Sequence, residues 1–122
     1  MQSSFQHTET NVRFALRTKA VTHVLLYNDV TYCEADGRYT RIHLAKGKSI
    51  MVAKQLKEFE DKFPKDKFIR VHRSFLINVD HMIGLAFKDK QYIILTSNIR
   101  IEVSRGYKKS LKGFLNNLLD II

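Results

Sequence analysis

The feature that most constrains the fold is a succession of short runs in which apolar and polar residues alternate. Alternation with a period of two places the apolar side chains of an extended chain on one face of a strand. Turn-forming residues stand between the runs, as in Lys46-Gly47-Lys48 and Ser97-Asn98. Many short strands separated by tight turns predict an antiparallel β architecture. The predicted strands span residues 12–19, 21–26, 30–34, 39–45, 49–52, 68–77, 81–88, 91–96 and 99–103.

Two segments have the period of a helix instead. In residues 53–63 the apolar residues recur at every third or fourth position, and Pro64 ends this helix. A second helix begins after Ser104, its predicted N-cap, with an apolar stripe formed by Tyr107, Leu111, Phe114, Leu115 and Leu118. The sequence thus predicts one mostly-β domain over residues 12–122, with a short inner helix and a C-terminal helix. Residues 1–11 are polar and lack periodicity, which predicts a flexible arm or the remnant of a linker.

The charge balance favours a polyanionic partner. The chain carries 21 Lys and Arg residues against 12 Asp and Glu residues, a formal net charge of +9. Such an excess is typical of proteins that bind nucleic acid or anionic lipid, although a soluble basic protein without such a partner is the alternative. No signal peptide opens the chain and no apolar run is long enough to span a membrane, so we expect a cytoplasmic protein with no membrane partner. Cys33 is the only cysteine, which excludes an intrachain disulfide and fits a reducing compartment.

The residues that could carry catalysis or bind a metal do not form a recognisable site. The five histidines show no spacing typical of metal ligands, and no second cysteine accompanies Cys33. His72 and Ser74 share a strand face, but they lack the strained nucleophile turn and the acidic partner of a catalytic triad. No glycine-rich phosphate loop is present. The sequence therefore predicts no enzymatic activity, no cofactor and no metal.

Residues 68–78, FIRVHRSFLIN, combine the apolar pattern of a strand with an unusual density of charge. Alternation places Arg70, His72 and Ser74 on one face of this strand and Arg73 on the other. The two arginines therefore point in different directions unless the strand bends or ends between them. We expect Arg70 to be the more structural of the two. Arg73, beside the end of the strand, is expected to be more exposed and able to meet an anion.

Arginines also stand on other predicted loops. Arg38 and Tyr39 follow the strand that ends near residue 34, and Arg105 precedes Gly106 at the start of the last helix. The planar guanidinium of arginine can bond both the edge of guanine and a phosphate group. Backbone N–H groups at the start of the last helix would also suit a phosphate oxygen. The alternative is that these residues are solvated turn charges, because a basic surface is an ambiguous signal.

Four stretches of the chain carry a family resemblance. In order, they are VTYCEADGRYTRIHL, SIMVAKQLKEFE, FIRVHRSFLIN and IEVSRGYKKSL. Together they resemble the LytTR DNA-binding domain, the output module of LytR/AlgR-type bacterial response regulators, and the resemblance runs over residues 14–118. It implies an elongated antiparallel β-sandwich of small sheets. It also implies a sequence-specific transcription regulator whose loops enter successive major grooves of double-stranded DNA.

The resemblance further implies roles for individual residues and partners. Base contacts would come from Arg38, Arg73 and Arg105. Contacts to the DNA backbone, or support for the interface, would come from Tyr39, Arg70, Lys108 and Lys109. His72 and Ser74 would hold the loop of Arg73 in place. The implied partners are DNA with repeated half-sites, a second copy of the chain on that DNA, an upstream receiver domain and a sensor kinase.

Two other functions stay open from the residues alone. A protein that binds single-stranded nucleic acid would stack bases on Tyr39, Phe87 or Tyr92. A protein-interaction module would use an exposed β edge or the apolar tail, residues 111–122.

Overall fold

The computed structural model describes residues 12–122, so the predicted arm, residues 1–11, lies outside the described part. The strands are β1 (Arg13–Arg17), β2 (Thr22–Leu26), β3 (Val30–Asp36), β4 (Tyr39–Leu44), β5 (Ser49–Val52), β6 (Phe68–His72), β7 (Phe75–Asn78), β8 (Met82–Phe87), β9 (Gln91–Leu95) and β10 (Ile99–Glu102). The helices are α2 (Leu56–Lys62) and α3 (Lys108–Leu118), and short 3₁₀ turns connect several strands.

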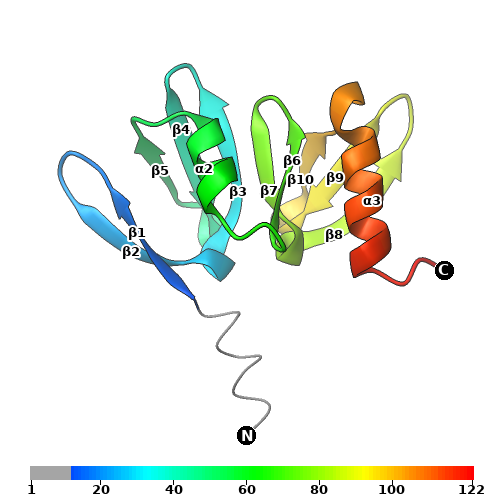
Figure 1. Cartoon of the computed structure of the whole chain (residues 1–122), viewed down its shortest axis with the longest axis horizontal. Helices are drawn as coiled ribbons and strands as arrows, with labels where there is room; N and C mark the ends of the chain where they lie inside the picture. The colour runs from blue at the N-terminus through cyan, green and yellow to red at the C-terminus, as the bar shows by residue number, and fades with distance from the viewer. Residues whose placement is uncertain (1–11) are drawn as a thin grey trace, which may run out of the picture.

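The strands form three small antiparallel sheets that stand side by side in an elongated molecule (Figure 1). The first is the β1–β2 hairpin, the second has the strand order β5-β4-β3-β7-β6, and the third has the order β10-β9-β8. Helix α2 lies against the five-stranded sheet, and α3 lies at the side of the three-stranded sheet (Figure 1). The mostly-β, elongated architecture predicted from the sequence is confirmed.

Two hydrophobic cores lie on opposite faces of the β6–β7 hairpin. The first core comprises Leu16, Val30, Cys33, Ile42, Val52, Leu56, Phe59, Phe63, Phe68 and Leu76. The second core comprises Ile69, Val71, Ile77, Val79, Ile93, Leu95, Ile101, Val103, Leu111 and Leu115. Because successive residues of a strand point to opposite faces, Phe68 enters the first core and Ile69 enters the second. A hairpin buried on both faces needs apolar residues on both, which explains why Phe68 and Ile69, and likewise Leu76 and Ile77, are adjacent in the sequence.

The prediction of one strand over residues 68–77 is wrong. The chain reverses at Arg73 and Ser74, and His72 pairs with Phe75 across a tight hairpin. An irregularity in the register also separates Arg70 from His72, which interrupts the simple alternation expected from the sequence. The turn contains neither glycine, proline nor asparagine, the residues that most strongly indicate a reversal. Because apolar residues continue on both sides of Arg73 and Ser74, the sequence gives no sign of this reversal.

Both helices begin later than predicted. Residues 53–55 remain outside α2, which starts at Leu56 and ends at Lys62, just before Pro64. Ser104 makes no side-chain capping bond; instead its backbone carbonyl accepts a hydrogen bond from the Tyr107 amide at 2.9 Å. This contact closes a 3₁₀ turn at residues 105–107, and α3 follows directly. Because the turn is closed by the backbone, the Ser104 hydroxyl is not needed as the cap.

Candidate nucleic-acid interface

Three turns lie at one end of the molecule, which we call the turn end and define as residues 36–39, 73–74 and 104–109. In Figure 1 these are the cyan turn between β3 and β4, the green turn between β6 and β7, and the orange start of α3. Backbone hydrogen bonds connect them. The Ala35 amide donates to the Ser74 carbonyl at 2.9 Å, and the Ser104 amide donates to the Val71 carbonyl at 3.0 Å. The relative positions of the three turns are therefore fixed by main-chain contacts.

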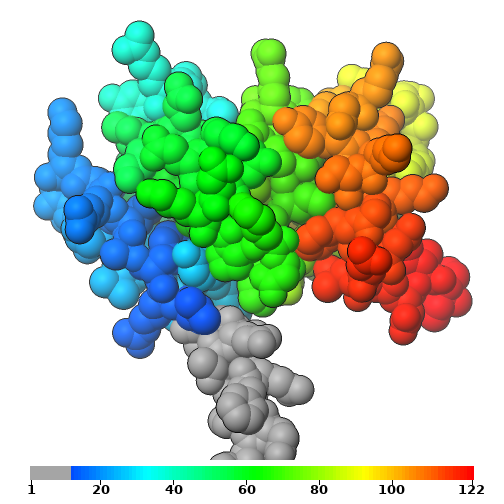
Figure 2. All heavy atoms as spheres, in the orientation of Figure 1, coloured from blue at the N-terminus to red at the C-terminus, as the bar shows by residue number. Residues whose placement is uncertain are grey.

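The arginines predicted to read DNA bases are all exposed on these turns. Arg38 follows Gly37, whose φ of +61° is a conformation that glycine adopts without strain. Arg73 lies at the tip of the β6–β7 hairpin and Arg105 in the 3₁₀ turn before α3. Among the described residues, none of the three forms an ion pair. Figure 2 shows the cyan, green and orange segments projecting from the same end, with gaps between them.

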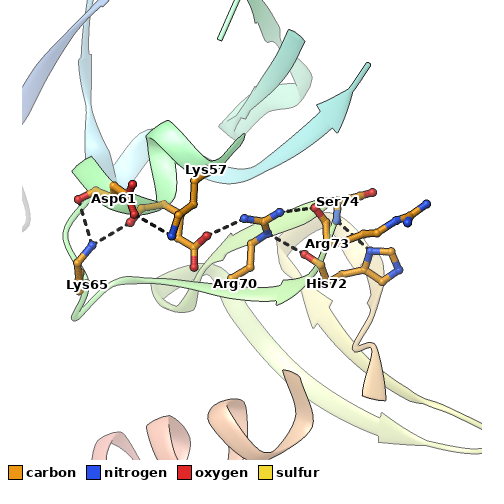
Figure 3. A network of polar contacts seen from close by, with 8 residues as sticks. Lys57, Asp61, Lys65, Arg70, His72, Arg73 and Ser74 are labelled. Carbon is orange, nitrogen blue, oxygen red and sulfur yellow. Dashed lines mark hydrogen bonds and ion pairs between the residues drawn. The ribbon is translucent and has the colours of Figure 1, made fainter. Parts of the chain in front are cut away.

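Arg70 lies inside the molecule, although it is only three residues from Arg73. Its side chain is 14% exposed, and its Nη1 bonds a carboxylate oxygen of Glu60 on α2 at 2.6 Å. Its Nε donates to the His72 carbonyl at 2.9 Å, and its Nη2 donates to the Arg73 carbonyl. Figure 3 shows the guanidinium between the helix and the hairpin turn, with the Arg73 side chain extending away from this network. Arg70 thus holds the backbone of the turn, and each of its three side-chain nitrogens donates a hydrogen bond within the molecule.

His72 and Ser74 also act on the turn itself. The backbone amide of Ser74 donates to Nδ1 of His72 at 3.0 Å (Figure 3). Because the amide supplies this contact, the Ser74 hydroxyl is not paired with the imidazole as a catalytic triad would require. This hydrogen bond closes the turn between β6 and β7.

The remaining predicted backbone contacts surround the three arginines. Tyr39, 49% exposed, begins β4 directly after Arg38. Lys108 and Lys109 are exposed in the first turn of α3, close in sequence to Arg105. The structure thus brings the predicted set to one end, with Arg70 on the inner side of it. Sequence reasoning missed Glu60, because a glutamate on the polar face of a helix gives no signal of its distant partner.

The opposite end of the five-stranded sheet is closed by polar side chains, and we call it the closed end, defined by Asn78, His81 and the carbonyls that they bond. Asn78 is fully buried; its Nδ2 donates to the Val30 carbonyl at 2.9 Å and to the Tyr27 carbonyl at 3.3 Å. Its Oδ1 accepts a bond from the Asp80 amide at 2.9 Å. Nε2 of His81 lies 2.6 Å from the Asn28 carbonyl, which accepts its proton. These contacts join segments about fifty residues apart.

Other residues considered from the sequence have no place at this interface. Phe87 and Tyr92 lie in the three-stranded sheet and Tyr39 lies in the five-stranded sheet, so the three aromatics do not share one β platform. Cys33 is fully buried in the first core, and burial raises the pKa of its thiol far above the usual value. Within residues 12–122, no group of three His, Cys, Asp or Glu side chains could hold a metal ion. No helix in this part of the chain is long and apolar enough to cross a membrane.

Two curated regulators are similar to this chain in sequence. A CO-responsive transcriptional regulator, RcoM of Rhodospirillum rubrum, is 43% identical over 89 residues, which cover 70% of this chain and 37% of that protein. The sensory transduction protein LytT of Bacillus subtilis is 37% identical over 70 residues, covering 56% of this chain and 29% of that protein. The chain thus spans about a third of the length of these curated relatives.

A solved structure has the same fold. It is the LytTr DNA-binding domain of a putative methyl-accepting/DNA response regulator from Bacillus cereus, with a TM-score of 0.73 and 28% identity. The match covers 84% of this chain and 95% of that domain. A family model described as the LytTr DNA-binding domain matches residues 20–116. The chain therefore belongs to the LytTr DNA-binding domain family.

Proposed function

We propose that the turn end binds double-stranded DNA sequence-specifically, with its turns entering successive major grooves. The observation that carries this proposal is the placement of three exposed arginines without ion-pair partners in the described chain, on neighbouring turns of one end. Arg38, Arg73 and Arg105 are the proposed base-reading residues. A guanidinium can bond O6 and N7 of guanine together, and each such pair contributes about 1–3 kcal/mol of discrimination against a wrong base.

Phosphate contacts supply affinity that does not depend on sequence. We assign these contacts to Tyr39, Lys108 and Lys109, which are exposed around the three arginines. The net charge of +9 favours such contacts and predicts an affinity that falls as salt concentration rises. Arg70, His72 and Ser74 support the interface indirectly, because they fix the backbone from which Arg73 projects.

The biological role that fits this activity is transcriptional regulation in the cytoplasm, without catalysis. Several relatives are sensory transduction proteins or transcriptional regulators, and this chain matches only part of each. We therefore propose that it acts as the output module of such a regulator, controlled by a receiver domain and a sensor kinase. Two copies would bind repeated half-sites on the same DNA.

The experiment that tests this function is selection from a random pool of double-stranded DNA. The affinity for the enriched sequence and for a shuffled duplex is then measured over a range of salt concentrations. We expect an enriched motif that is bound far more tightly than shuffled DNA at equal salt. Binding without enrichment would contradict sequence-specific recognition. Tighter binding of the single strands in competition would instead favour the single-stranded alternative.

A protein-interaction role is a second candidate, favoured by the apolar surface of β8. Strand β8 stands at the edge of the three-stranded sheet, and Ile83, Leu85 and Phe87 on it are exposed. An exposed apolar edge strand is a surface on which another chain can pair. Sedimentation equilibrium of the free protein distinguishes this role: a dimer without DNA would support it, whereas a monomer at high protein concentration would contradict it.

A further inference from the structure

A basic cleft lies beside the turn end, and Tyr39 is the one residue of its lining that already belongs to the proposed interface. It has a volume of about 600 Å³ and lies between the tip of the β1–β2 hairpin and the start of β4, with the segment after β5 as its other wall. Its polar lining comes from Arg17, Thr18, Lys19, Tyr39 and Lys54. No carboxylate lines the cleft in the described chain. The cleft therefore gathers positive charge without any internal counter-charge.

The hairpin wall of this cleft is held by the turn that carries Lys19. The Thr18 amide donates to the Val21 carbonyl at 2.9 Å, and the Thr18 hydroxyl donates to the same carbonyl at 2.8 Å. The Val21 amide returns a hydrogen bond to the Thr18 hydroxyl at 3.1 Å. These hydrogen bonds hold the loop between β1 and β2 in one conformation, and this loop positions Arg17 and Lys19.

The opposite wall is anchored in the sheet. The hydroxyl of Thr40, a fully buried residue of β4, donates to the Lys54 carbonyl at 2.7 Å. The Lys54 amide donates to the Val52 carbonyl at 2.8 Å, which ends β5 in a tight turn. Thr40 is the neighbour of Tyr39, so this contact also fixes Lys54 relative to the β3–β4 turn. The two walls thus place their cations by backbone and buried contacts.

In the part of the chain that the structure describes, the cations of the cleft have no acidic partners. Arg17, Lys19 and Lys54 are exposed, and none forms an ion pair within residues 12–122. Like charges that are held together repel one another, and an anion in the cleft would remove that repulsion. The Tyr39 hydroxyl adds a neutral donor to the same lining.

The position of the cleft next to the proposed DNA interface indicates which kind of anion it would bind. Tyr39 directly follows Arg38, so the cleft continues the row of turns proposed to lie on DNA. In Figure 1 the blue tip of the β1–β2 hairpin lies beyond the cyan β3–β4 turn, on the side away from the other two turns. We propose that this cleft binds phosphodiester groups of the DNA backbone that flank the base pairs nearest Arg38. The inference rests on the proposed DNA binding and extends its footprint at one flank.

The test compares two variants that each remove two lysine charges. Lys19→Gln/Lys54→Gln empties the cleft of its lysines, whereas Lys46→Gln/Lys48→Gln removes two exposed lysines near the closed end, after β4. Both leave the proposed base-reading arginines intact. Far-UV circular dichroism and the urea midpoint first establish that both variants are folded as the wild type is.

Binding is measured on the selected half-site in duplexes that end flush with it or extend on one flank or the other. We expect wild-type protein to gain affinity from extension on one flank, and the Lys19/Lys54 variant to lose that gain. The slope of log K against log salt on the extended duplex should fall in magnitude by about 2 for this variant, since each neutralised phosphate contributes about 0.9. The Lys46/Lys48 variant should retain both the gain and the slope.

Two results would overturn the cleft proposal while leaving DNA reading intact. One is an equal change of slope in both double variants, and the other is a flank effect that persists without the cleft lysines. A wild-type protein that does not prefer the selected sequence to shuffled DNA would overturn the proposed function itself, and the cleft proposal with it.

Discussion

At the closed end of the five-stranded sheet, polar side chains bond the chain to itself, whereas at the turn end the arginines project into solvent. Buried Asn78 satisfies the Val30 and Tyr27 carbonyls and the Asp80 amide. Arg73, five residues earlier, has no ion-pair partner in the described chain. One short motif therefore contributes a residue that fixes the fold and a residue that is free to bind.

The difference shows how a surface made of turns can be held rigidly enough to recognise a ligand. Turns have few contacts of their own, and a mobile arginine would lose entropy on binding. Here the turns are held by contacts on their inner side. Arg70, paired with Glu60, bonds the β6–β7 turn, and backbone hydrogen bonds join neighbouring turns. Substitutions at the closed end should therefore change stability, and substitutions on the turns should change DNA binding.

The largest effect is expected for Asn78→Ala. The change removes the side-chain partner of two carbonyls and one amide around a fully buried residue, which costs about 3 kcal/mol of unfolding free energy. Urea denaturation measures this loss. Asn116→Ala, at an exposed site on α3, is the control and should change stability by less than about 0.5 kcal/mol. Similar midpoints for the two variants would contradict the role given to Asn78.

A smaller loss, about 1–2 kcal/mol, is expected for Arg70→Ala. The change removes an ion pair whose carboxylate is 32% exposed, and it releases two carbonyls of the hairpin turn. Hydrogen exchange of the Ser74 amide should accelerate at the same time. Glu60→Gln is the matched variant and should lose less, because its amide oxygen can still accept from Arg70. Unchanged exchange at Ser74 in Arg70→Ala would show that the turn does not depend on Arg70.

Arg73→Ala should leave stability unchanged and reduce the preference for selected over shuffled DNA by about 1–3 kcal/mol. Arg73→Lys keeps the charge but removes the planar fork, so it should lose most of the same preference. Competition binding with the two duplexes at fixed salt measures both variants. An equal loss of affinity on both duplexes for Arg73→Ala would assign Arg73 to phosphate contact instead of base reading.

The smallest effect is expected for Lys109→Ala, which should weaken binding to selected and shuffled DNA alike. Loss of one phosphate contact lowers the magnitude of the salt slope by about 1. Titrations at several salt concentrations measure this slope for each duplex. A loss confined to the selected sequence would place Lys109 among the base-reading residues.

The turns of this protein differ in how clearly their residues indicate a reversal of the chain. Lys46-Gly47 and Ser97-Asn98 were predicted as turns, and all four residues have the positive φ that such segments favour. The Arg73-Ser74 turn was missed, because its residues have no such preference and its flanking strands are apolar on both faces. The relative exposure of Arg70 and Arg73 was nevertheless predicted correctly, from the position of Arg73 beside a strand end.

The sequence by itself determined the short strands, most of the turns and the positive charge, because alternation and turn preference depend on neighbouring residues. Its motifs also identified the family. Only the tertiary structure decided that Arg38, Arg73 and Arg105 share one end, that Glu60 on α2 holds Arg70, and that Lys19 and Lys54 face one cleft. These relations join residues far apart in the chain. Strand pairing and core packing determine which distant residues become neighbours, and the local sequence pattern does not indicate which segments will pair.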